Sequence, residues 1–265
     1  MRSGRRGSYL GAILDANTTG YLDALLERLG QELGEGLAGA YLFGSVALED
    51  YRPPRSDLDV AVVSARPLTQ AQRERLAARL DHRNLACPAR KLELVVYEKG
   101  RLAAGEVAFE LDLNTGPGLH DWRDDPEASP SHWYVLDVAI GHEHGRTVVG
   151  PPVATLFPAL EHERILQAIR ESLDWHIDSG GTGDAEADPA DTVLNACRGW
   201  RFLEEGTWSS KSRAGRWALS RTARTDVVGE ALARREHGER GPSAAAARRF
   251  AAAVRRRAER PPARH

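Results

Sequence analysis

Two aspartates one residue apart follow a Gly-Ser pair in the segment FGSVALEDYRPPRSDLDVAVV, residues 43–63. The apolar runs at 38–43 and 58–63 are typical of buried β-strands. Side chains at positions i and i+2 of a strand point to the same face, so Asp57 and Asp59 are expected to project together. Carboxylate oxygens are ligands for Mg2+, which also keeps substrate phosphates in its coordination shell. The pair therefore indicates a site for magnesium and a phosphate-bearing substrate.

A third acid lies on the next apolar run, KLELVVY, residues 91–97. Its alternation predicts a strand with Leu92 and Leu94 on one face and Glu93 on the other. If this strand neighbours residues 58–63, Glu93 faces Asp57 and Asp59. Three carboxylates with one or two Mg2+ ions suit phosphoryl or nucleotidyl transfer. The metal ions neutralise a triphosphate, and one carboxylate can accept the proton of an attacking hydroxyl.

The Gly-Ser pair and a later serine are candidates for holding that phosphate. Gly44 ends a predicted buried strand and lets the backbone approach a phosphate closely. Ser45 is expected to cap a following helix or turn, whose free N–H groups bind anionic oxygens. Ser56 could add a second hydroxyl. A lone pair of aspartates at this spacing is common on surface strands, and a lone Gly-Ser pair is usually a turn. Their combination at this spacing indicates catalysis.

Helical and strand patterns alternate over the first hundred or so residues. Residues 18–33 and 69–83 have helical patterns, and they alternate with the three predicted strands. Residues 112–132 are rich in Gly, Pro and Asp and are expected to form a long, functional loop. These patterns predict an α/β domain over residues 1–150.

Helical patterns dominate from residue 133 onward and predict an all-helical second domain over residues 151–265. A Gly-rich segment at 178–191 contains five acidic residues and no basic one. Residues 248–265 carry seven arginines against one glutamate. Such a basic tail is expected to be a frayed, solvated terminus.

Composition excludes several classes of protein. The 265 residues are 42% hydrophobic and 28% charged, and the formal net charge of −2 gives no general attraction to nucleic acid or to a membrane. The two cysteines are far apart, which fits neither a disulfide framework nor a zinc site. No apolar run approaches the roughly 18 residues of a membrane span. We expect a cytoplasmic protein that acts as a monomer.

The order of these motifs resembles a known family. The Gly-Ser pair followed by Asp57 and Asp59 is similar to the signature of the DNA polymerase β-like nucleotidyltransferase superfamily. Over most of residues 38–238, the chain resembles the bacterial aminoglycoside (streptomycin/spectinomycin) adenylyltransferases. The segments that carry this resemblance, in order, are LFGSVALEDYRPPRSDLDVAVV, KLELVVYEKG, HEHGRTVVGPP, VLNACRGW and SKSRAGRWAL.

The resemblance implies an α+β fold, with an N-terminal polymerase β-like nucleotidyltransferase domain followed by an all-α helical bundle. It implies an ATP- and Mg2+-dependent O-adenylyltransferase. This enzyme would modify a hydroxyl of an aminoglycoside or aminocyclitol antibiotic, spectinomycin or streptomycin or both, and release pyrophosphate. ATP and the cationic drug would be held in the cleft between the domains.

Carried over position by position, the resemblance also assigns roles to residues. Asp57, Asp59 and Glu93 would bind the metal ions, and Glu93 would be the general base toward the drug hydroxyl. The backbone at Gly44 would lie close to the nucleotide phosphates. The side chains that would contact these phosphates are Ser45, Ser56, Arg198 and Lys211. Two acids of the 178–191 segment would face the cationic drug, namely Asp184 and Asp188.

This sequence departs from the family at two places. The streptomycin-active relatives have a tryptophan in the loop after the third strand, where the sequence here is NTGPGLHDW. Trp122 or Trp133 could replace it only with a shifted alignment, which weakens the case for streptomycin. His237 stands where the relatives have a tyrosine near the nucleotide, so nucleotide selectivity is left open.

Two alternatives are also left open. The same fold and chemistry could serve another acceptor, such as a different cationic metabolite or a protein hydroxyl. Alternatively, the chain could be a non-enzymatic nucleotide-sensing or RNA-binding module that uses the arginine tail. The RNA-binding alternative predicts strongly salt-dependent binding that is lost when residues 248–265 are deleted.

Overall fold

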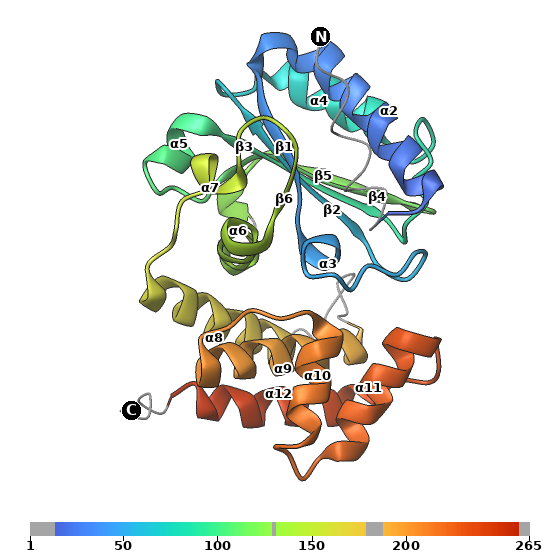
Figure 1. Ribbon diagram of the computed structural model, residues 1–265, viewed down its shortest axis with the longest axis vertical. Coiled ribbons are helices and arrows are strands. Elements are labelled where there is room, and N and C mark those ends of the chain that lie inside the picture. The colour runs from blue at the N-terminus through green and yellow to red at the C-terminus, as the bar shows by residue number, and fades with distance from the viewer. Residues whose placement is uncertain (1–13, 129–130, 179–187, 260–265) are drawn as a thin grey trace. The chain divides into compact units, whose positions relative to one another are not determined.

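The computed structural model describes residues 14–128, 131–178 and 188–259 (Figure 1). The chain divides into two compact units, Met1–Leu160 and Glu161–His265. Each unit has its own secondary structure, mixed α/β in the first and helical in the second. The predicted fold class is confirmed. Asp184, a predicted substrate-binding residue, lies outside the described residues.

The N-terminal unit is built on one six-stranded sheet with the strand order β5-β4-β3-β2-β1-β6. Strands β2 and β3 are parallel, and every other neighbouring pair is antiparallel. The strands are β1 (Leu37–Leu42), β2 (Leu58–Ser64), β3 (Leu92–Glu98), β4 (Phe109–Gly116), β5 (Leu119–Arg123) and β6 (Arg146–Val149). The parallel pair brings the segments around Asp57 and Glu93 next to each other.

Helices cover both faces of this sheet (Figure 1). Helices α2 (Ala16–Leu33) and α4 (Gln70–Leu80) lie over one face, where leucines and valines form the larger apolar core. Helix α6 (Ser131–His144) and the short α7 (Val153–Leu156) pack on an aromatic core at the opposite face. The shorter elements are η1 (Gly34–Gly36), α3 (Gly44–Ala47), α5 (Lys99–Ala103) and η2 (Pro126–Ala128).

Local sequence explains where the two long covering helices begin. Asp15 caps α2 by accepting a hydrogen bond from the Thr18 N–H at 2.7 Å. The buried positions of α2 recur at helical spacing and place one leucine stripe against the sheet. Thr69 and Gln72 form a capping box at the start of α4. Both predicted helices are present.

The predicted loop at residues 112–132 is wrong, because a hairpin of β4 and β5 occupies most of it. Pro117 and Gly118 form the two-residue connection, and Gly118 has a φ of +73°. Proline followed by a glycine of positive φ is the pattern of a tight turn. Turn-forming residues therefore mark only the tip of the hairpin. Strand β6 was also missed.

The first unit ends at Leu160, about ten residues beyond the predicted boundary. The reason is Phe157, which is fully buried in the aromatic core of this unit. Its ring lies edge-on to Tyr41, Phe43 and Tyr97, with centroids 5.4, 5.0 and 5.5 Å away. Such aromatic contacts stabilise the fold beyond simple area burial, so this segment belongs to the sheet rather than to the helices that follow.

In the C-terminal unit, helix α9 (Pro189–Glu205) packs against the four others that the structure describes. These are α8 (His162–Asp178), α10 (Lys211–Leu219), α11 (Thr225–His237) and α12 (Ala244–Arg257). The expectation of a frayed basic tail is wrong as far as Arg257, because Phe250 and Val254 bury one face of α12. Across the described ranges, no helix is long and apolar enough to cross a membrane.

Asp81, directly after α4, links that helix to the hairpin. Its buried carboxylate is 2.6 Å from the Arg83 guanidinium and 3.0 Å from Nδ1 of His120 on β5. It also accepts the Arg83 backbone N–H at 2.8 Å. The hydrogen bond from the Arg83 side chain is the largest cause that lowers the pKa of Asp81 from 3.8 to about 2. The charged form is therefore stabilised in the folded state.

Because its pKa is depressed on folding, Asp81 contributes stability above about pH 4, and this contribution is lost as the pH falls toward 2. We expect Asp81→Asn to lower the free energy of unfolding at pH 7 by about 1–2 kcal/mol. The variant should also be less destabilised by acid than the wild type. Urea titrations at pH 7 and pH 3 measure both effects. Asp23→Asn, an exposed acid on α2, is the control and should behave like the wild type.

Candidate active site

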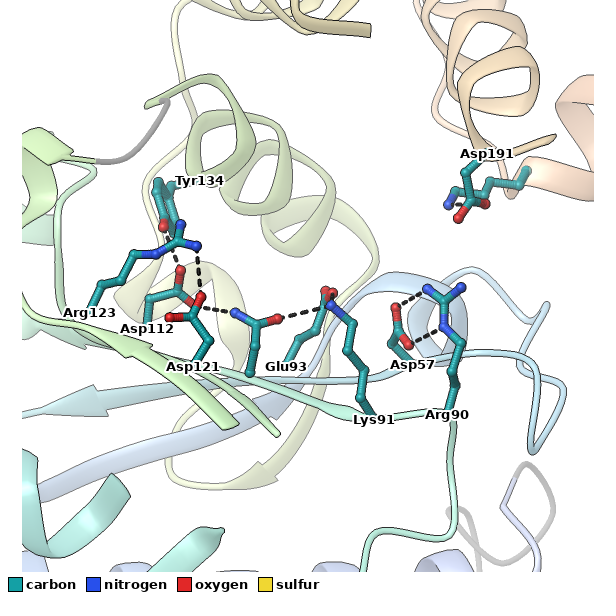
Figure 2. Close-up of polar contacts among 11 residues, drawn as sticks. Asp57, Arg90, Lys91, Glu93, Asp112, Asp121, Arg123, Tyr134 and Asp191 are labelled. Atoms are coloured by element: carbon teal, nitrogen blue, oxygen red, sulfur yellow. Dashed lines mark hydrogen bonds and ion pairs between the residues drawn. The ribbon is translucent and has the colours of Figure 1, made fainter. Parts of the chain in front are cut away.

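Four polar residues form a lateral row on one face of the sheet. In the strand register, Asp59 on β2 is opposite Glu93 on β3, Glu93 is opposite Asn114 on β4, and Asn114 is opposite Asp121 on β5. Figure 2 shows Glu93 and Asp121 on this face, with Asp57 farther along it. The two acid-bearing strands are neighbours, which is the condition under which Glu93 was expected to face the aspartates. The sheet thus gathers Asp57, Asp59 and Glu93 in one place.

Gly44 lies directly against the carboxylate of Asp59. A Cβ atom at position 44 would stand 2.0 Å from Oδ2 of Asp59 and 2.4 Å from its Cγ. Gly44 also has a φ of +51°, a conformation that other residues rarely adopt. The Phe43 N–H donates to the Asp59 carbonyl at 3.0 Å, which ties the turn after β1 to β2. Glycine is required here for the backbone to approach the acid.

Ser45 does not cap a helix, so that prediction is wrong. It is the second residue of the four-residue α3, whose N-cap is Phe43 and has no side-chain capping bond. The Ser45 hydroxyl is buried and has no hydrogen-bond partner among the described residues. A buried hydroxyl without a partner is uncommon, and a bound polar ligand could satisfy it. The predicted contact with triphosphate stays a prediction.

Ser56 shapes the loop that leads into Asp57. Its buried hydroxyl accepts the Arg52 backbone N–H at 3.1 Å, and its own N–H donates to the Arg52 carbonyl at 2.9 Å. These bonds close the turn before β2, and this turn sets the position from which Asp57 projects. The predicted contact between Ser56 and nucleotide is not tested by this geometry.

Two basic residues directly before β3 form ion pairs with two of the acids (Figure 2). Arg90 binds Asp57 through both its Nε and Nη2 atoms, at 2.7 and 2.6 Å. The ammonium of Lys91 lies 2.6 Å from Oε1 of Glu93. The Arg90 pair is bidentate, the strongest geometry for an arginine with a carboxylate. Neither basic residue was singled out from the sequence.

Lys91 is also held from its other side. Its Nζ donates to Oδ1 of Asn114 at 3.0 Å, and Nδ2 of Asn114 donates to Asp112 at 3.1 Å. The other oxygen of Asp112 accepts the Tyr134 hydroxyl of α6 at 2.7 Å. A continuous hydrogen-bonded chain therefore runs from Glu93 across β4 to α6 (Figure 2). Asp112 and Asn114 were not identified from the sequence, because residues 112–132 were predicted to be a loop. The structure places both residues on strand β4.

Asp57 and Asp59 resist ionisation, because their pKa values are raised. Burial raises the pKa of Asp59 well above its usual value, and the nearby charges of Glu93, Asp57 and Asp137 raise it further. Burial also raises the pKa of Asp57, against the hydrogen bond from Arg90, which lowers it. For Lys91, burial lowers the pKa, but the charges of Glu93 and Asp57 outweigh burial and raise it overall. Burial therefore opposes ionisation of Asp57 and Asp59.

The donor atoms of Asp57, Asp59 and Glu93 fit a hard cation, since Mg2+ prefers carboxylate oxygens. Within the described parts of the chain, however, no group of three or more His, Cys, Asp or Glu side chains is already arranged to hold a metal ion. Arg90 and Lys91 instead contact two of these acids. Magnesium binding by these residues stays a prediction.

In the C-terminal unit, the predicted phosphate and substrate ligands lie on and beside α9. Arg198 is in the middle of this helix. Lys211 begins α10, and its Nζ is 2.7 Å from Oδ1 of Asp191. Asp188 caps α9 by accepting the Ala190 N–H at 2.8 Å. These contacts explain local structure in the unit, and the predicted roles in nucleotide and drug binding stay predictions.

The two candidate tryptophans also have definite places. Trp122 on β5 pairs with Leu113 and packs against the core under α2 and α4, on the face opposite Glu93. Trp133 lies on α6 beside His132. His237 is the last residue of α11. Trp122 is thus directed away from the row of acids.

Comparison with known proteins shows the family. Residues 22–110 match the nucleotidyltransferase domain family, and residues 155–258 match the C-terminal domain family of the aminoglycoside adenylyltransferases. The chain belongs to the aminoglycoside adenylyltransferases of the nucleotidyltransferase superfamily. It is accordingly an aminoglycoside nucleotidyltransferase.

A solved structure has the same fold. Spectinomycin adenyltransferase AAD(9) from Enterococcus faecialis, crystallised with ATP and spectinomycin, superposes with a TM-score of 0.73. The match covers 92% of this chain and 100% of the other, at 18% sequence identity. At this identity the likeness concerns the fold.

Gly44→Ala should destabilise the protein by about 2 kcal/mol or more, because the added Cβ overlaps Asp59 and the backbone has a positive φ. Displacement of Asp59 should also reduce turnover. Urea unfolding and a pyrophosphate-release assay measure the two effects. Gly20→Ala on α2 is the matched control, since its Cβ would meet nothing within 4 Å. It should be neutral or stabilise the protein by up to about 1 kcal/mol.

Proposed function

We propose that this enzyme transfers an adenylyl group from ATP to a hydroxyl of an aminoglycoside or aminocyclitol antibiotic and releases pyrophosphate. The observation that carries the proposal is the register that places Asp59 beside Glu93, with Asp57 two residues before Asp59. The family of the chain supplies the reaction class. The similarity to AAD(9), which was crystallised with ATP and spectinomycin, supports ATP as the donor and spectinomycin as the first acceptor to test.

Glu93 is the proposed general base. The acceptor oxygen attacks the α-phosphorus of ATP, the bond from that phosphorus to the leaving oxygen breaks, and pyrophosphate departs. The hydroxyl proton passes to the Glu93 carboxylate, which lies on the sheet face next to Asp59. A general base of this kind contributes about 10²–10⁴-fold to the rate.

Asp57 and Asp59 are the proposed magnesium ligands, together with Glu93. When bound, Mg2+ would neutralise negative charge on the triphosphate. Gly44 leaves room beside Asp59, and the buried Ser45 hydroxyl next to it is a donor for a phosphate oxygen. Arg198 and Lys211 are proposed as further phosphate ligands, because each presents a cation from the family's C-terminal domain.

The surroundings of Glu93 favour a cationic acceptor. Asp112 and Asp121 lie on the same face of the sheet, on the two strands beyond it. Aminoglycosides carry several ammonium groups, which interact favourably with such carboxylates. Asp184 and Asp188 are proposed to bind the same cationic groups. Charge reversal at these two positions should reduce turnover of a cationic drug and spare a neutral acceptor.

The deciding experiment is pyrophosphate release by the purified protein with ATP and Mg2+. Spectinomycin, streptomycin, other aminoglycosides and a reaction without acceptor should be compared. Release with one class of drug would establish the reaction and its acceptor. Binding of ATP without release for any drug would support the alternative, an acceptor that is another metabolite or a protein hydroxyl. Absence of both binding and release would contradict the proposal.

Asp57→Asn should abolish metal-dependent turnover, because the substitution removes the charge that holds the metal. The variant should remain folded, as judged by circular dichroism. The exposed Asp23→Asn provides the control and should keep wild-type rates. A near-normal rate for Asp57→Asn would mean that the metal is bound elsewhere.

Glu93→Gln should lower kcat by about 10²–10⁴-fold, because an amide cannot accept the hydroxyl proton. Binding of ATP, measured by isothermal titration calorimetry, should be largely retained. A rate within a few-fold of the wild type would assign the base to another residue.

A further inference from the structure

Arg90 and Lys91 are consecutive residues, yet each contacts a different acid of the proposed catalytic set. The Arg90 guanidinium binds Asp57 with two hydrogen bonds, and the Lys91 ammonium binds Glu93 at 2.6 Å. Figure 2 shows both basic side chains on the same side of the sheet as the acids. The proposed metal ligands are thus already in contact with positive charges of the chain itself.

These contacts are held in place by further bonds. The Arg90 N–H donates to the Ser56 carbonyl at 3.0 Å, which ties this residue to the loop before Asp57. The Lys91 ammonium is bound on its second side by Asn114 at 3.0 Å, and only 23% of the Lys91 side chain is exposed. A cation fixed between two acceptors and partly shielded from water differs from a mobile surface lysine, whose ion pairs contribute little.

Existing ion pairs limit what can bind to this arrangement. Arg90 occupies both carboxylate oxygens of Asp57, and Lys91 occupies one carboxylate oxygen of Glu93. A divalent metal ion that bound alone would have to displace both cations from these oxygens and would then lie close to two positive charges. A metal ion that arrives with a triphosphate brings its own excess of negative charge, so the same two cations then favour binding.

We propose that Arg90 and Lys91 are internal counter-ions of the catalytic acids and make the binding of a divalent metal ion depend on the triphosphate. They hold the carboxylates in position before nucleotide binds and prevent tight binding of the metal alone. They are positioning residues, because they act through Asp57 and Glu93. This inference rests on the proposed function, since it takes the three acids as metal ligands.

Binding of Mn2+ alone to the nucleotide-free protein tests the proposal directly. Electron paramagnetic resonance of free Mn2+ gives the affinity without any turnover. Lys91→Met removes the charge and keeps a side chain of similar length, and we expect it to bind Mn2+ at least about tenfold more tightly than the wild type. Lys99→Met, an exposed lysine at the start of α5, is the matched control and should leave the affinity unchanged.

Two further variants separate charge from structure. Arg90→Gln should also raise the affinity for Mn2+ alone, whereas its control Arg66→Gln, at an exposed position, should not. Lys91→Arg keeps the charge and should restore the weak binding of the wild type. Circular dichroism confirms that each variant is folded, and Lys91→Arg keeps the test decisive if Lys91→Met fails to fold.

Calorimetry with Mn2+ and α,β-methylene-ATP distinguishes failure of this inference from failure of the proposed function. If the wild type binds the metal–nucleotide complex but the neutral variants gain no affinity for Mn2+ alone, the counter-ion role is overturned and the proposed function stands. Wild-type binding of Mn2+ alone as tight as binding of the complex would also overturn it. If neither the wild type nor any variant binds the complex, the proposed function itself is contradicted.

Discussion

Carboxylates held side by side on neighbouring strands repel one another, and burial makes Asp57 and Asp59 harder to ionise. This constraint governs the polar face of the N-terminal unit. The parallel pairing of β2 and β3 places Asp59 opposite Glu93, and the same register puts Asp57 on their face. Around these acids the chain supplies Arg90, Lys91 and a hydrogen-bonded chain that ends at α6. Asp57 and Glu93 each have a cationic partner in this arrangement.

The apolar parts of the sheet explain why the acids lie where they do. One face is sealed by α2 and α4 over leucines and valines, and the other is covered by α6 and α7 through an aromatic core. Phe157 is the centre of that core, with three aromatic rings around it. Gly44 has no Cβ atom, and one added there would collide with Asp59. Rigid packing on both sides is what allows a few polar groups to keep a defined geometry.

The two matched families divide the molecule much as the structure does. The nucleotidyltransferase family covers the strands that carry Asp59 and Glu93, and the adenylyltransferase C-terminal family covers the helices around α9. The first contains the acids that we propose as metal ligands and general base. The second contains Arg198, Lys211 and Asp188. Lys211 forms an ion pair with Asp191, and Asp188 caps α9. The counter-ion role that we propose for Arg90 and Lys91 links binding of the metal ion to binding of the nucleotide. The negative charge of the triphosphate is what makes the two basic side chains favourable neighbours of the metal ion.

Sequence alone was sufficient for the parts that rest on local pattern. Strand alternation predicted a shared face for Asp57 and Asp59 and the polar face of its strand for Glu93. Cap and stripe patterns predicted α2 and α4. These signals depend on neighbours in the chain. Tertiary structure decided the rest. The β4–β5 hairpin, the membership of Phe157 in the first unit and the partners of Arg90 and Lys91 all depend on pairing between distant segments. Such pairings are set by strand register and burial. The residues near one another in the sequence do not determine which distant segments pair.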